Sequence, residues 1–135
     1  MSMENYLLKG KTAVVTGCSR GIGKSIFEKF VENGANCIAC VRKSDTKFED
    51  YCKSLSSKNN VKINVVSFDL SNSDEVLEGA KKIFNISKKI DILVNNAGIL
   101  FNSLFQMTSE KKLKEIFQIN FFSHVILTQL ISREM

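Results

Sequence analysis

The chain has 135 residues, a formal net charge of +5 and 44% hydrophobic residues. This length and composition suit one domain with a buried core, and no apolar run reaches the roughly 20 residues of a membrane span. The lysines are spread over separate segments and form no single stripe, so neither a nucleic acid nor a membrane is expected as a partner.

The N-terminus and the cysteines both bear on the compartment. The opening residues Met-Ser-Met-Glu-Asn-Tyr lack the basic and apolar regions of a signal peptide, so a cytoplasmic location is expected.

Cys37 and Cys40 have the spacing of some metal sites, but residues three apart on a predicted strand (36–41) point to opposite faces. We predict no metal site and structural roles for all the cysteines: Cys18, Cys37, Cys40 and Cys52.

The first predicted unit is a strand over 11–16 that leads through a glycine-rich turn into a helix. The strand is apolar and β-branched, and apolar residues then recur at helical spacing: Ile26, Phe27, Phe30 and Val31. In the turn, Gly17 permits a tight bend, Gly21 lets the backbone approach a pyrophosphate, and Gly23 lets the helix pack closely. The N–H groups of the first helical turn would point at phosphate oxygens.

This turn has two other interpretations. A plain loop that needs positive φ is one, and the strand-to-helix context argues against it. A Walker A loop is the other, because Gly23-Lys24-Ser25 supplies its ending. That motif requires a glycine where Cys18 stands, and Gly17 is one residue too early.

Further strands and helices alternate along the chain. The predicted strands cover 37–41, 61–68 and 90–94. The first helix ends at Asn33-Gly34, and the next begins at Ser44 or Asp45 and ends before the polar segment 56–60. A third helix is capped within 71–74, and a fourth begins at Thr108 or Ser109 and continues to the end of the chain.

This alternation predicts one α/β domain over 1–135. Right-handed crossovers would give a Rossmann-type, doubly wound parallel sheet with the strand order 3-2-1-4. The topological switch then falls between the first and fourth strands, so a ligand is expected outside the carboxyl ends of the strands there.

The end of the second strand bears on the choice of cofactor. An acid there would bind a ribose 2′-hydroxyl and repel a 2′-phosphate, but Val41 occupies the position. Arg42 follows it and Arg20 lies in the glycine turn, and guanidinium groups suit phosphate. We predict NADP in preference to NAD. The alternatives are that Arg42 is an ordinary surface charge and that Asp45 turns back towards a ribose.

The segment Thr16-Gly-Cys-Ser-Arg-Gly-Ile-Gly23 resembles the cofactor loop of the short-chain dehydrogenases/reductases, especially those similar to 3-oxoacyl-acyl-carrier-protein reductase. The resemblance implies that Asp69, with Leu70, contacts the adenine and that Asn120 helps to hold a proton-relay water. The other cofactor-binding residues that it implies are Gly17, Ser19, Arg20, Gly21, Ile22, Gly23, Arg42, Asn95, Asn96, Ala97 and Gly98.

Three of these assignments have a simpler alternative, which for the segment 95–98 is a bare turn. Asp69 suits a turn or helix cap, and Asn120 suits a helix surface or a bond to the backbone. His124 is the only histidine and has no acid or nucleophile near it in the sequence, so we predict a structural role.

The resembled family uses a Tyr acid/base, a Lys four residues later and a Ser. Tyr6 and Tyr51 are the only tyrosines, and Gly10 and Leu55 follow them at that spacing. The resemblance thus implies an NADP-dependent oxidoreductase acting on a carbonyl or acyl substrate, truncated after the fourth helix and inactive alone. The alternatives are a cofactor-binding module and a structural or regulatory fragment. It also implies a homo-oligomer through the fourth helix.

Overall fold

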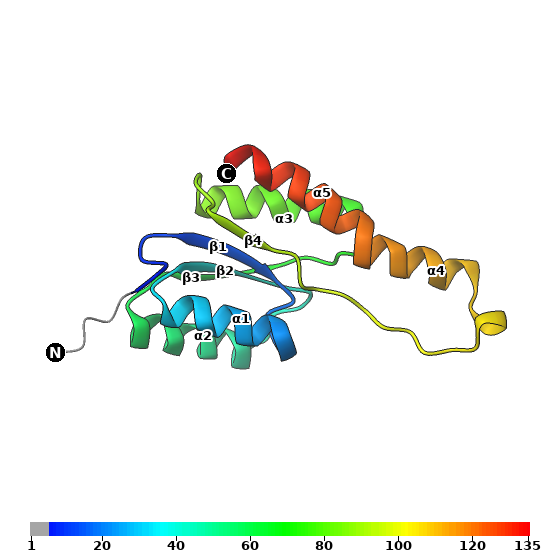
Figure 1. The fold of residues 1–135 in the computed structure, drawn as a ribbon, viewed down its shortest axis with the longest axis horizontal. Coiled ribbons are helices and arrows are strands. Elements are labelled where there is room, and N and C mark those ends of the chain that lie inside the picture. The colour runs from blue at the N-terminus through cyan, green and yellow to red at the C-terminus, as the bar shows by residue number, and fades with distance from the viewer. Residues whose placement is uncertain (1–5) are drawn as a thin grey trace.

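A computed structural model describes residues 6–135 (Figure 1). Residues 1–5, on which most of the signal-peptide prediction rests, lie outside the described residues. Within the described range, no helix combines the length and the apolar composition that crossing a bilayer would require.

The centre of the molecule is a parallel sheet whose strands lie in the order β3-β2-β1-β4, which confirms the predicted order. The strands are β1 (Thr12–Thr16), β2 (Asn36–Val41), β3 (Ile63–Ser67) and β4 (Ile92–Val94). Val14 at the middle of β1 pairs with Ile38 of β2 on one side and with Leu93 of β4 on the other.

Helices cover both faces of the sheet (Figure 1). They are α1 (Gly21–Glu32), α2 (Thr46–Asn59), α3 (Ser73–Ile86), α4 (Glu110–Phe117) and α5 (Ser123–Ile131). Helices α1 and α2 lie on one face, and α3 and α5 lie on the other. The segment after β4 and helix α4 extend beyond the carboxyl edge of the sheet.

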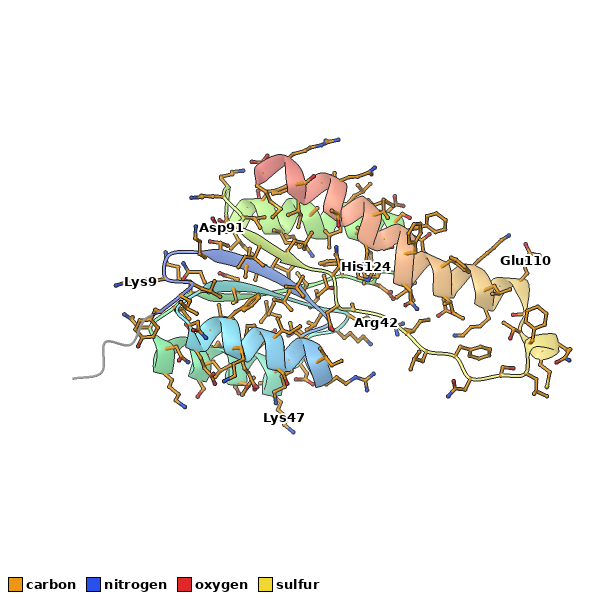
Figure 2. The ribbon with its side chains drawn as sticks, viewed as in Figure 1. Lys9, Arg42, Lys47, Asp91, Glu110 and His124 are labelled. Atoms are coloured by element: carbon orange, nitrogen blue, oxygen red, sulfur yellow. The ribbon has the colours of Figure 1, made fainter. Side chains whose placement is uncertain are left out.

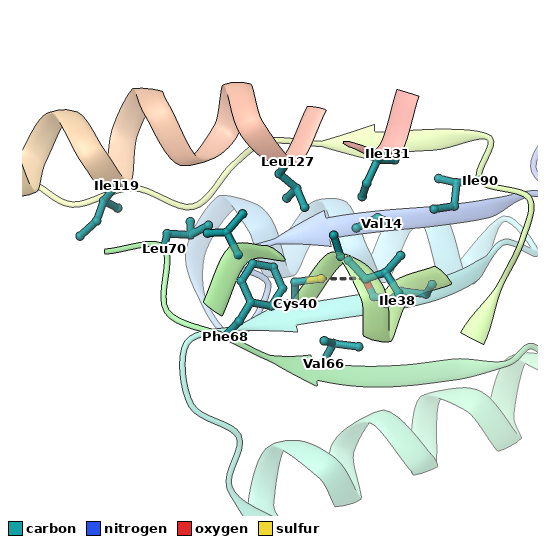
Figure 3. Packing of buried hydrophobic residues seen from close by; sticks show 13 residues of the cluster. Val14, Ile38, Cys40, Val66, Phe68, Leu70, Ile90, Ile119, Leu127 and Ile131 are labelled. Carbon is teal, nitrogen blue, oxygen red and sulfur yellow. Dashed lines mark hydrogen bonds between the residues drawn. The ribbon is translucent and has the colours of Figure 1, made fainter. Parts of the chain in front are cut away.

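The alternation of side chains along the strands divides the core between the two faces. Val14 packs with Leu127 and Ile131 of α5 (Figure 3), whereas its neighbours Ala13 and Val15 pack on the side of α1 and α2. Because β-strand side chains alternate, each buried strand supplies both cores.

The cysteines follow the same division. Cys37 packs in the core beside α1 and Cys40 in the core beside α3, so the prediction that they point to opposite faces is confirmed. All the cysteines are buried free thiols. Burial raises the pKa of Cys18 to about 12 and that of Cys52 to about 11, which keeps these groups protonated and unreactive.

The predicted end of the second helix is wrong. Helix α2 does not stop before 56–60 but continues to Asn59: Ser57 and Lys58 face solvent, and the half-buried Asn59 side chain donates to the Leu55 carbonyl at 2.9 Å. Asp45 is its N-cap and accepts a hydrogen bond from the Phe48 N–H at 2.8 Å. Asn60 ends the helix in the left-handed conformation, with φ 52°.

Three predicted strands begin earlier than the observed ones. Strand β1 begins at Thr12, β3 at Ile63 and β4 at Ile92, instead of at residues 11, 61 and 90. The Ile90 N–H points to the Glu134 carbonyl at 3.4 Å rather than to β1. Pairing with β1 begins at Asp91, whose N–H donates to the Thr12 carbonyl at 2.9 Å.

The predicted fourth helix begins as expected but is interrupted. Ser109 is the N-cap and its hydroxyl accepts from the Lys112 N–H at 3.2 Å. Between α4 and α5 the backbone forms a π-helical turn, Gln118–Phe122. Shorter 3-10 turns are η1 (Phe105–Met107), before α4, and η3 (Ser132–Glu134), after α5.

Candidate functional site

A cavity of about 570 Å³ lies at the carboxyl edge of the sheet, at the predicted topological switch. Most of the site residues predicted from the sequence line this cavity. These lining residues are Gly17, Ser19, Arg20, Gly21, Ile22, Arg42, Asp69, Leu70, Asn96, Ala97 and Gly98. Gly23, Asn95 and Asn120 are predicted site residues that do not line it.

The turn after β1 forms one wall of the cavity. Gly17 has φ 67°, and a Cβ there would lie 2.8 Å from the Ala97 Cα, so both the conformation and the close approach require glycine. A Cβ on Gly23 would overlap the Gly17 carbonyl and the Asn96 side chain. Gly23 therefore lets the start of α1 sit against the loops that hold the site.

Thr16 joins the turn after β1 to the segment after β4. Its hydroxyl accepts hydrogen bonds from the N–H groups of Asn96 at 3.0 Å and Ala97 at 3.1 Å, and donates to the Val94 carbonyl at 3.3 Å. The Asn96 side-chain amide donates to the carbonyls of Thr16 and Gly17, both at 3.1 Å. Together these bonds make the two loops one rigid wall.

Asn95 faces helix α5 rather than the cavity. Its amide nitrogen donates to the Thr128 hydroxyl at 2.8 Å, and its oxygen lies 3.2 Å from His124 Nδ1. His124 Nε2 lies 2.6 Å from the Ala97 carbonyl. Figure 2 places His124 and Arg42 at the same end of the sheet. His124 therefore holds the segment 95–98 against α5.

Asn120 lies within the π-helical turn, and its side-chain amide forms hydrogen bonds with both the N–H and the carbonyl of Ile99. Its oxygen accepts from the Ile99 N–H at 2.8 Å, and its nitrogen donates to the Ile99 carbonyl at 2.9 Å. A Cβ on Gly98 would lie 3.3 Å from the Asn120 oxygen. The arrangement is the backbone-bonded alternative raised above, and π-helical turns often occur at functional sites.

Ser123 ties the π-helical turn to the opposite wall of the cavity. Its hydroxyl is buried, donates to the Leu70 carbonyl at 2.5 Å and accepts from the Gln118 amide at 2.9 Å. The turn that carries Asn120 is therefore fixed relative to both Leu70 and Ile99.

Arg42 and Asp69 form an ion pair beside the cavity, with Arg42 Nε 3.1 Å from Asp69 Oδ2. Burial opposes ionisation of Asp69, but hydrogen bonds from Ser71 and the guanidinium of Arg42 outweigh it and lower the pKa of the carboxyl. Asp45, the alternative ribose ligand, is instead engaged in capping α2. The end of β2 itself carries no acid, and at this wall the charge of Arg42 is paired with that of Asp69.

The sequence reasoning missed Thr16, Ser123 and the contacts of His124. A hydroxyl at the end of an otherwise apolar strand was the available signal for Thr16, because a buried hydroxyl needs partners. For Ser123 and His124 the partners are distant in the chain, and no local pattern indicates them.

Residues 11–135 match the short chain dehydrogenase family. The chain is 33% identical to a 3-oxoacyl-acyl-carrier-protein reductase, FabG, of Aquifex aeolicus, covering 95% of this chain and 51% of that one. It is 34% identical to an L-rhamnose 1-dehydrogenase (NADP(+)) of Thermoplasma acidophilum, covering 94% and 50%.

Among solved structures, the L-sorbose reductase of Gluconobacter frateurii complexed with NADPH and L-sorbose superposes with a TM-score of 0.90 at 28% identity. That match covers 97% of this chain and 49% of the reductase. The chain spans about half the length of the curated relatives that it matches. On the family match, the strand order and the glycine-rich turn, it belongs to the short-chain dehydrogenase/reductase family.

Proposed function

We propose that this chain binds NADP(H) in the cavity at the carboxyl edge of the sheet, as the cofactor-binding part of a carbonyl-reducing oxidoreductase. The observation that carries the proposal is the wall after β2. There Arg42 lines the cavity together with Arg20, and Val41 occupies the position at which an acid would bind a ribose 2′-hydroxyl. The sorbose reductase bound to NADPH supports a nicotinamide dinucleotide as the ligand.

The cavity fits the pyrophosphate and adenosine of such a cofactor. N–H groups at the start of α1 would bind the pyrophosphate, and Gly21, which has open space beside it, would let the phosphates approach. Asp69 and Leu70 would bind the adenine, with Gly98 in the wall behind the adenosine. The 2′-phosphate would lie at Arg42.

The remaining predicted residues have supporting roles in this proposal. Arg20 and Ser19 would assist at the phosphates, Ile22 would cover the cofactor, and Gly23 would keep α1 close. The segment Asn95, Asn96, Ala97 and Gly98 would form the wall, and only Asn95 would act from outside the cavity by fixing the segment to α5.

The cofactor supplies hydride, and the protein must supply a proton to the developing alkoxide. No Tyr-x-x-x-Lys occurs within the 135 residues. We propose that this chain by itself binds the cofactor without reducing a carbonyl. Asn120 would contribute to a proton relay only beside such a tyrosine and lysine, and its fixed position on the π-helical turn supports that role.

The substrate is proposed only as a class. The relatives named above are called reductases or dehydrogenases of 3-oxoacyl groups and sugars, which share a carbonyl or alcohol carbon as the reacting atom. A carbonyl or acyl substrate is therefore proposed.

A cytoplasmic location and self-association belong to the same proposal. Buried free thiols suit a reducing compartment. Helix α4 and the π-helical turn expose large aromatic side chains, among them Phe117, Phe121 and Phe122, which is the composition of an interface.

Fluorescence titration of the whole chain with NADPH and with NADH tests the proposal. Tighter binding of NADPH is expected, and Arg42→Ala should remove most of the difference, because a charge-assisted bond contributes about 1.5 to 3 kcal/mol. Exposed Lys47→Ala is the matched control for loss of one positive charge. Equal affinity for the two cofactors would contradict NADP as the ligand.

A further inference from the structure

Asp69 is held in place by hydrogen bonds of both its backbone and its carboxylate. Its backbone N–H donates to Glu75 Oε2 at 2.8 Å, and its carbonyl accepts from the Asn72 N–H at 3.1 Å. Its Oδ1 accepts from the Ser71 N–H at 2.8 Å. The other carboxylate oxygen, Oδ2, is thereby aimed at Arg42.

Arg42, by contrast, is largely exposed to solvent. Its side chain is 79% exposed, against 24% for Asp69. Within residues 6–135, the bond from Nε to Asp69 Oδ2 is the only hydrogen bond or ion pair of its guanidinium. The two terminal nitrogens keep their N–H groups for another acceptor. A guanidinium held by Nε still presents a flat pair of donors at its far edge.

We propose that Asp69 is a positioning residue for cofactor selection: it holds the Arg42 guanidinium so that its terminal N–H groups face the 2′-phosphate. This inference rests on the proposed binding of NADP(H). A free arginine loses rotamer freedom when it binds phosphate, whereas an arginine already held by Asp69 loses less. Asp69 therefore favours NADPH over NADH without touching the 2′-phosphate.

The negative charge of Asp69 acts in the other direction, because it repels a phosphate and offsets the charge of Arg42. The exposure of Arg42 decides between the two effects. Solvent and salt screen the longer-range repulsion between Asp69 and a phosphate at this surface more than they weaken the Asp69–Arg42 hydrogen bond, which acts over only 3.1 Å. The net effect of Asp69 is a preference for NADPH, and because exposed ion pairs are weak, it is about three- to fivefold.

The test measures the dissociation constants of NADPH and NADH for the whole chain and four variants: Asp69→Asn, Arg42→Ala, the double variant and Asp74→Asn. The quantity compared is the NADH constant divided by the NADPH constant. Asp69→Asn should lower this ratio about three- to fivefold, and it should leave the ratio unchanged in the Arg42→Ala background. Asp74→Asn controls for loss of one exposed negative charge in the same region.

The ratio separates this role from a contact with the adenine, since losing an adenine contact weakens both cofactors equally. An unchanged or raised ratio in Asp69→Asn overturns the inference. An equal fall in the Arg42→Ala background also overturns it, because Asp69 would then act without Arg42. If Arg42→Ala itself leaves the ratio unchanged, the proposed 2′-phosphate site fails, and the two failures are thus distinguished.

Discussion

Thr16 and Asn96 bind each other in both directions across the candidate site. The Thr16 hydroxyl accepts from the Asn96 N–H at 3.0 Å, and the Asn96 side chain donates to the Thr16 carbonyl at 3.1 Å. Thr16 is 1% exposed, so water cannot replace its partner groups easily. The pair therefore fixes the segment after β4, which forms a wall of the cavity, relative to the end of β1.

Replacing Thr16 with valine should destabilise the fold by about 1 to 3 kcal/mol, because the N–H groups of Asn96 and Ala97 lose their acceptor. Urea unfolding measures the change. Thr16→Ser keeps the hydroxyl and should lose no more than about 1 kcal/mol, which is the contribution of the missing methyl group. Equal stability of Thr16→Val and the wild type would show that the joined loops do not depend on this hydroxyl.

Gly21→Ala should weaken NADPH binding about tenfold, because Gly21 lines the cavity where the phosphates are proposed to approach. The substitution also strains the backbone, since Gly21 has φ 59°. Gly10→Ala is the matched control: Gly10 has φ 77° and open space around it, but it precedes β1 at the other end of the sheet.

Both glycine variants should lose about 1 to 2 kcal/mol of stability from the strained backbone. Only Gly21→Ala should change the affinity for the cofactor, as measured by fluorescence titration. If both variants bind NADPH equally well, the phosphates do not approach this part of the turn.

Asp91 should make stability depend on pH. Its carboxylate accepts from the Thr12 N–H at 2.9 Å, and that bond, helped by Lys11 and Lys89, lowers the pKa of the carboxyl in the folded chain. A lowered folded pKa stabilises the fold above the ordinary aspartate pKa of about 3.9, and this stabilisation is lost as the pH falls through the folded value.

Urea unfolding between about pH 6 and pH 2.5 tests this linkage. Asp91→Asn should lose stability less steeply on acidification than the wild type. Lys11→Met should keep most of the dependence, because the Thr12 N–H is the largest cause of the shift. Identical pH profiles for the wild type and Asp91→Asn would mean that another carboxylate controls the acid transition.

The layers of the fold were predictable because each depends on local pattern. Apolar strands such as 12–16 and amphipathic helices such as 73–86 alternate, and right-handed crossovers leave few arrangements for them. The error at α2 has a local cause: the polar residues 56–59 suit a loop by composition, yet they also suit an exposed helical face. Helix α2 ends at Asn60, whose backbone is left-handed. Because many residue types can precede a cap of this kind, the residues before Asn60 do not mark the end of the helix.

The site was predictable where residues lie close after the end of a strand. Arg42, Asp69 and Asn96 follow successive strands, so the parallel sheet brings them to one edge. The π-helical turn under Asn120 was not predictable, because one extra residue in a turn barely changes the 3.6-residue apolar period. The hydrogen bond from Arg42 to Asp69 depends on side-chain conformation, which the spacing of residues in the sequence does not specify.

Self-association is expected from two surfaces. Strand β4 is an edge of the sheet, and sheet edges recruit partners through unpaired backbone groups. On the π-helical turn, Phe121 is 55% exposed and packs edge to face on Phe122, with ring centroids 5.4 Å apart. Burying about 400 Å² of apolar surface would contribute about 10 kcal/mol before the costs of association.

Phe121→Asp should therefore raise the dissociation constant of the oligomer at least about tenfold, because the carboxylate would have to be buried without a partner. Light scattering over a micromolar dilution series measures it. Phe105→Asp is the matched control, since Phe105 is 87% exposed but lies in the 3-10 turn before α4. A wild-type chain that stays a cooperatively unfolding monomer throughout the series would show that α4 and the β4 edge need no partner.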